Sequence, residues 1–87
     1  MYVILVYDIS EKRVGKACKL CRRYLNWVQN SVFEGEITDA KLARLRHAFG
    51  ELMEGKEDSV LIYKLRTESA VDREVMGIEK LPTDNLF

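Results

Sequence analysis

The side chain with the clearest chemical potential is Asp8, a carboxylate that ends the apolar stretch YVILVYD near the start of the chain. A carboxylate at the rim of a sheet can bind a divalent metal ion or act as a general base. It can also satisfy backbone groups in a turn between a strand and a helix, although Ser10 is available for that task. From position alone, the turn role is favoured slightly.

One carboxylate supplies few of the ligands that metal-dependent phosphodiester chemistry needs. Mg²⁺ takes octahedral oxygen ligands, often from one or two carboxylates together with phosphate and water. The other acid close to Asp8 in the sequence is Glu11. A two-fold homodimer would supply a second carboxylate, because such an interface can bring a residue close to its own copy.

A run of basic side chains follows Asp8 and forms the second group of candidates. Few opposite charges stand at helical spacing to neutralise these cations. A phosphate backbone is their natural counterion, so we favour nucleic-acid binding over the usual alternative, a solvated face. The predicted nucleic-acid-binding residues are Lys12, Arg13, Lys16, Lys19, Arg22 and Arg23.

The remaining reactive side chains carry weaker signals. Cys18 and Cys21 form a CxxC pattern, but a zinc site needs two more ligands, and the chain holds one histidine, His47. Both cysteines lie on the apolar stripe of the expected helix, so we predict core thiols rather than a redox pair. We expect His47 on the surface. Trp27 and Phe33 are predicted to pack in the core or an interface, with base stacking as the alternative.

Length and composition indicate one domain over residues 1–87. A domain of this size buries only roughly 60–65% of its unfolded surface and often completes its core by oligomerising. The two cysteines make no disulfide framework, and no apolar run has signal-peptide or transmembrane character. We therefore expect a cytoplasmic protein with no membrane partner.

Apolar periodicity predicts the elements that position these side chains. Residues 2–7 predict a buried central strand, and Ser10 is a plausible N-cap of an amphipathic helix. Residues 26–37 predict strand, either one kinked strand or two short antiparallel strands. Thr38 is expected to cap a second helix that Gly55 ends.

The later residues complete a two-layer arrangement. Residues 59–65 predict an apolar strand, and residues 70–78 predict a weaker one. Two helices and a sheet in so short a chain indicate an α+β sandwich. With a hairpin at residues 26–37, the order becomes βαββαβ, the ferredoxin-like fold with an antiparallel sheet and an extra C-terminal strand.

Several segments together resemble the CRISPR-associated protein Two family, whose members partner the integrase that inserts new spacers into a CRISPR array. The segments are YDIS at the end of the first strand, KR at the start of the helix, VQNSVFEGEIT, and a late GIEKLP. The resemblance covers nearly the whole chain, and VQNSVFEGEIT is its specific part.

The resemblance implies a homodimer in which residues 67–87 form a C-terminal strand segment that pairs with the partner protomer. It implies that two copies of Asp8 face each other and share a divalent metal ion, Mg²⁺, so that Asp8 is both metal ligand and catalytic residue. Some members cleave RNA or double-stranded DNA. In others the acid is dispensable for spacer acquisition, and the dimer is a scaffold for the integrase and its DNA.

The expected function is therefore a spacer-acquisition scaffold with Mg-dependent endonuclease chemistry at paired Asp8 as an added capability. The alternative is a structural adaptor without physiological nuclease activity. The expected partners are a second copy, the CRISPR integrase subunit, and double-stranded DNA, with RNA as the alternative. Many members carry an arginine where this chain has Trp27, so Arg13 and Lys16 would have to supply that phosphate contact.

Overall fold

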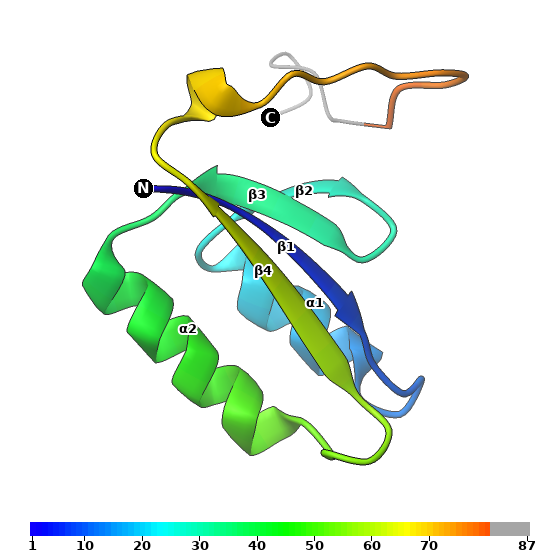
Figure 1. Ribbon diagram of the computed structural model, residues 1–87. Coiled ribbons are helices and arrows are strands. Elements are labelled where there is room, and N and C mark those ends of the chain that lie inside the picture. Colours follow the sequence, from blue (N-terminus) through cyan, green and yellow to red (C-terminus); the bar gives the residue numbers. More distant parts are fainter. Residues whose placement is uncertain (81–87) are drawn as a thin grey trace.

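The computed structural model describes residues 1–80 and contains one antiparallel sheet with two helices on one of its faces (Figure 1). The elements are β1 (Tyr2–Asp8), α1 (Val14–Arg22), β2 (Asn26–Gln29), β3 (Val32–Glu36), α2 (Asp39–Leu52), β4 (Ser59–Leu65) and the short 3-10 helix η1 (Glu68–Ala70). The strand order is β2-β3-β1-β4, with every neighbouring pair antiparallel. The predicted ferredoxin-like sandwich is confirmed.

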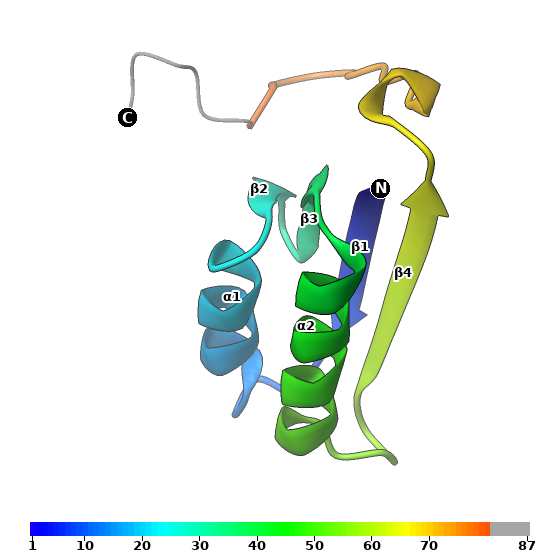
Figure 2. The same cartoon turned by 90° about the vertical axis from the view of Figure 1, so that its left-hand side faces the viewer.

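The hydrophobic core lies between the sheet and the two helices (Figure 2). Its buried members are Val3, Leu5, Tyr7, Ala17, Cys21, Leu25, Phe33, Ile37, Leu42, Leu45 and Phe49. Tyr7 stacks on Phe33 with their ring centroids 6.1 Å apart. Successive side chains of a strand point to opposite faces, so Tyr2, Ile4, Val6 and Asp8 lie on the face without helices, which we call the open face.

Residues 26–36 form a hairpin, which decides between the two alternatives for this stretch. The turn lies at Asn30 and Ser31, and Asn30 has a φ of 45°, a left-handed conformation that asparagine tolerates better than most residues. The register shifts between Trp27 and Gln29, which places a bulge in β2.

The helix termini differ partly from the predictions. Thr38 caps α2 as predicted, its hydroxyl accepting the Lys41 N–H at 3.2 Å. Ser10 does not cap α1, because its own N–H donates to Asp58 and its carbonyl closes a turn with the N–H of Arg13. Helix α1 therefore begins only at Val14.

Helix α2 ends at Leu52, before the predicted glycine stop at Gly55. Met53 is already extended, and the N–H of Glu54 donates to the carboxylate of Asp58 instead of continuing the helical ladder. A side-chain hydrogen bond therefore ends this helix.

The predicted strand at residues 70–78 does not form within residues 1–80, where η1 and an extended segment follow β4 instead. This segment crosses the sheet from the β4 side toward β2 (Figure 2). A chain that crosses strands cannot make a ladder with them, so a strand here needs another edge to pair with. The end of the predicted 67–87 strand segment lies outside the described residues. No helix of residues 1–80 is long and apolar enough to span a membrane.

Candidate metal site and nucleic-acid surface

Asp8 is the last residue of β1, and its exposed side chain lies on the open face. Its backbone pairs with Ser59 at the start of β4, so the central strand β1 and its neighbour β4 support the carboxylate together. None of the ion pairs within residues 1–80 involves Asp8. The carboxylate is therefore available to a ligand outside the described chain.

The donor set around Asp8 fits Mg²⁺ only in part. A carboxylate oxygen is the ligand type that Mg²⁺ prefers. Within residues 1–80, however, no group of three or more His, Cys, Asp or Glu side chains could hold a metal ion. A metal ion at Asp8 would need further oxygen ligands from water, phosphate or a second chain.

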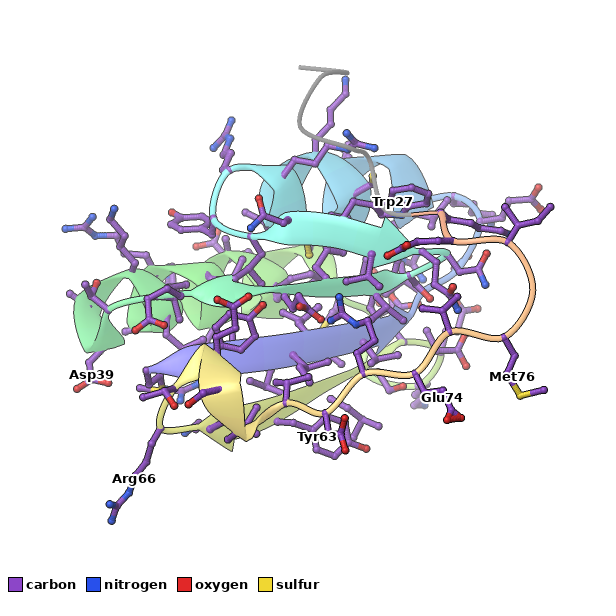
Figure 3. All side chains as sticks on the ribbon, turned by 90° about the horizontal axis from the view of Figure 1, so that it is seen from above. Trp27, Asp39, Tyr63, Arg66, Glu74 and Met76 are labelled. Carbon is purple, nitrogen blue, oxygen red and sulfur yellow. The ribbon has the colours of Figure 1, made fainter. Side chains whose placement is uncertain are left out.

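A row of apolar side chains on the open face ends at Asp8. Val6 pairs with Leu61, and Ile4 pairs with Tyr63. Leu61 and Tyr63 are 55% and 56% exposed. Figure 3 shows Tyr63 on the side of β4 remote from the helices. We call Ile4, Val6, Leu61 and Tyr63 the apolar strip; Asp8 stands at its end.

Asp58 is the residue near the site that the sequence analysis missed. Its fully buried carboxylate accepts the N–H groups of Ser10 at 2.8 Å and Glu54 at 2.9 Å. It also accepts Arg13 Nε at 2.8 Å and Arg13 Nη2 at 3.1 Å. We call this arrangement the Asp58 junction. It joins the segment after Asp8 to the turn before β4. Asp58 therefore satisfies the backbone groups of this turn, the role that sequence position alone favoured for Asp8.

Residue type does not distinguish Asp58 from the other acids of its loop. Glu54, Glu57 and Asp58 all lie in the polar stretch between α2 and β4. The Arg13 partner is 45 positions away. Only the position of the acid immediately before an apolar strand hints at a structural role.

The junction also changes the interpretation of Arg13, which we predicted to bind phosphate. Its guanidinium donates to Asp58 and, through Nη2, to Glu57 at 2.8 Å. These charged hydrogen bonds hold the pKa of Asp58 well below its usual range. Because its donors face the protein's own carboxylates, we leave Arg13 out of the phosphate-binding surface proposed below.

We expect the Asp58 junction to make the fold sensitive to acid. The folded pKa of Asp58 lies below its unfolded value of about 3.9. Its stabilisation is therefore complete well above that value and is lost progressively as the pH falls from about 5 toward the lowered folded pKa. Thermal unfolding of Asp58→Asn from pH 2 to 7 should show a lower midpoint at neutral pH and a flatter acid slope than wild type.

The matched control is Glu57→Gln, which removes the exposed partner of the same arginine. It should change the neutral midpoint much less, because exposed ion pairs contribute little. Parallel pH profiles for wild type and Asp58→Asn would contradict this role.

The other predicted nucleic-acid-binding residues are exposed: Lys12, Lys16, Lys19, Arg22 and Arg23. Lys16, Lys19 and Arg23 line one shallow groove together with Leu20. We call these three the cation stripe. None of the three forms an ion pair within residues 1–80. Their helical spacing covers about 10 Å, roughly the axial length of three phosphates along one DNA strand.

The remaining candidates have structural surroundings. Cys21 is fully buried, and burial raises the pKa of its thiol to about 12, so it stays protonated; Cys18 is half-buried. Trp27 packs against the core, and its indole N–H donates to the Asn30 carbonyl at 3.0 Å. His47 is exposed. The prediction of a core thiol is confirmed for Cys21, whereas Cys18 is only partly buried and packs against the core from outside. The predictions of a packed Trp27 and a surface His47 are confirmed.

Comparisons with known proteins agree on one family. The model of the CRISPR associated protein Cas2 family matches residues 1–73. The chain is 55% identical over 87 residues to the CRISPR-associated endoribonuclease Cas2 of Thermococcus kodakarensis, covering 100% of both.

Two solved structures extend the likeness to the whole fold. One crystal structure of Cas2 has 43% identity and a TM-score of 0.88, covering 97% of this chain and 94% of that one. Streptococcus pyogenes Cas2 has 32% identity and a TM-score of 0.79, covering 88% and 100%. With sequence and fold in agreement over this length, the chain belongs to the CRISPR-associated Cas2 family.

Proposed function

We propose that this chain acts as a homodimer in CRISPR spacer acquisition, where it holds double-stranded DNA for the integrase and has Mg-dependent endonuclease chemistry at paired Asp8 as a second capability. The observation that carries the proposal is the position of Asp8, exposed and without an ion-pair partner in residues 1–80, at the end of the apolar strip. The apolar strip suits contact with a second copy of the chain, because such contact would bury the apolar side chains of both copies and bring the two Asp8 carboxylates together.

The apolar strip supports the homodimer. Leu61 and Tyr63 are too exposed for side chains that have found their packing partners. Stacking two open faces about a two-fold axis would cover both strips and bring each Asp8 toward its copy. Strand β4 is one of the two edges of the sheet, and a C-terminal segment from the partner could extend it by β-augmentation.

Paired Asp8 carboxylates would complete the oxygen donors that one chain lacks. Two like charges at close range repel, and a shared divalent cation removes that repulsion. A bound Mg²⁺ would lower the pKa of its water and stabilise charge on the scissile phosphate. The chain's own contribution is to hold each carboxylate at the tip of a paired central strand. The endoribonuclease name of the Thermococcus relative supports RNA as one substrate.

The cation stripe supports binding to a nucleic-acid backbone. Its three cations have no acidic partner within residues 1–80, so a phosphate strand can take that place. Such contacts position a duplex without reading its sequence. This sequence-independent holding is what a scaffold for spacer DNA requires.

The assembly is tested by sedimentation. We expect a dimer at micromolar concentration, and we expect deletion of the residues after Gly77 to weaken it, because the deleted segment would pair with the partner's β4 edge. A monomeric wild type would contradict the homodimer. An unchanged oligomeric state after the deletion would contradict the proposed strand exchange.

A further inference from the structure

The C-terminal segment is fastened to the open face by a buried polar cluster. The Tyr2 hydroxyl donates to Glu34 Oε2 at 2.6 Å, and Arg73 Nη2 donates to Glu34 Oε1. Tyr2 and Glu34 are only 5% and 7% exposed. We call this cluster the Tyr2–Glu34–Arg73 anchor. It joins β1, β3 and the segment that follows η1.

The anchor is a strong constraint because each carboxylate oxygen of Glu34 has a partner. A buried carboxylate without its cation is an uncompensated charge, which costs far more than the loss of a surface pair. Arg73 supplies the single cation paired with Glu34 in residues 1–80. Glu34 therefore ties Arg73, and with it the segment, to the domain.

The C-terminal segment has two parts: residues near the anchor lie against the domain, and the residues that follow are exposed to solvent. Around the anchor, Arg73, Glu74 and Val75 line a shallow hollow with Val28, Gln29 and Val32, and Met76 lies at its margin. Beyond it, Met76 and Ile78 are 89% and 83% exposed. Figure 3 shows Met76 projecting away from the sheet. Both apolar side chains therefore bury little of their surface in residues 1–80.

We propose that the Tyr2–Glu34–Arg73 anchor positions the C-terminal segment for a second copy of the chain, an inference that rests on the proposed homodimer. The anchor lies on the open face, the same face as the apolar strip and Asp8. The exposed side chains of Met76 and Ile78 match the partner's exposed Leu61 and Tyr63 in apolar character. Holding Arg73 at a fixed point orders the residues that follow it before the partner arrives.

The anchor should therefore act on dimer affinity through preorganisation. A loose segment must lose conformational freedom when it pairs, whereas an anchored one has already lost part of it. Ordering the backbone of one additional residue during dimerisation weakens binding by about tenfold. We expect Arg73→Met, which keeps the aliphatic stem, to raise the dimer dissociation constant by about tenfold or more.

The test compares Arg73→Met, Glu34→Gln and the double variant with wild type by sedimentation across dilutions, with unfolding followed by circular dichroism. The double variant leaves neither charge of the pair behind, so it should keep the fold while its dimer stays weakened. Amide exchange at residues 71–76 should be faster in each variant than in wild type. Arg66→Met is the matched control, because Arg66 is exposed and forms no ion pair within residues 1–80; it should leave dimer affinity unchanged.

Three outcomes would overturn the inference, and they separate it from the homodimer itself. A wild type that stays monomeric at every concentration removes the homodimer and the anchor's role together. A dimeric wild type matched in affinity by the folded double variant leaves the homodimer standing and refutes the anchor. An Arg66→Met dimer weakened as much as the Arg73→Met dimer also refutes it, since general charge would then be the cause.

Discussion

Reversing the cation stripe with Lys16→Glu, Lys19→Glu and Arg23→Glu is expected to lower affinity for duplex DNA by about 100-fold or more at 0.1 M salt. Three attractive charges become three repulsive ones on one groove. Replacement of the same residues by alanine should also flatten the dependence of log affinity on log salt concentration, by about 0.9 for each phosphate that is no longer neutralised. Fluorescence anisotropy with a labelled duplex across a salt series measures both quantities.

The matched control for net charge is the triple reversal of Lys41, Arg44 and Arg46, exposed residues of α2. It makes the same change in charge on a different helix and should cost much less affinity. Equal reductions in the two triple variants would show that overall charge, and not the cation stripe, determines binding. Arg13→Ala gives a further contrast. It should lower the unfolding temperature, because it breaks the Asp58 junction, and it should leave the salt dependence of DNA affinity nearly unchanged.

Asp8→Asn is expected to reduce Mg-dependent cleavage of RNA and of double-stranded DNA to the level seen without metal. The substitution is nearly isosteric, so the tip of β1 should keep its shape. It removes the charge that would draw a divalent cation to the exposed end of the apolar strip. The assay uses purified wild type and variant, each with and without Mg²⁺.

Two controls make that result specific. Glu11→Gln neutralises the nearest acid in sequence and should leave cleavage intact, because Glu11 lies in the turn after β1 and not at the tip of that strand. A contaminating nuclease would cut in the wild-type and the Asp8→Asn preparations alike. Undiminished cleavage by a clean Asp8→Asn preparation would contradict a catalytic role for this carboxylate.

The parts of the fold that depend on local patterns were predictable. The apolar run of β1, the cap at Thr38 and the apolar stripe of α2 all follow from short-range preferences of the residues concerned. The position of Asp8 at the end of a central strand follows from the same run. The hairpin at residues 26–36 was not decided by such preferences, because Asn30-Ser31 and Glu34-Gly35 both allow a turn.

The parts that depend on distant pairs were not predictable. Asp58 accepts a hydrogen bond from the Ser10 N–H, 48 positions away, and α1 begins only after this turn. The same carboxylate accepts hydrogen bonds from Arg13. Glu34 forms an ion pair with Arg73, 39 positions away, and this pair holds the C-terminal segment against the sheet. Composition and periodicity contain no information on which buried acid meets which cation. The free energy of burying each carboxylate decides these pairings once the sheet has formed.

We propose that holding DNA, and not cutting it, is the cellular task of this protein. Each chain offers one candidate catalytic carboxylate, Asp8, and a groove lined by three cations. These features are better suited to positioning a duplex than to selecting and cleaving it.

Spacer acquisition in cells that carry the integrase and a CRISPR array tests this claim most directly, with wild type, Asp8→Asn and the reversed cation stripe compared at equal protein levels. We predict that Asp8→Asn acquires spacers like wild type, whereas the reversed stripe does not. Loss of acquisition by Asp8→Asn, in a folded dimer that still binds the integrase, would contradict the scaffold function and make catalysis the main work of the protein.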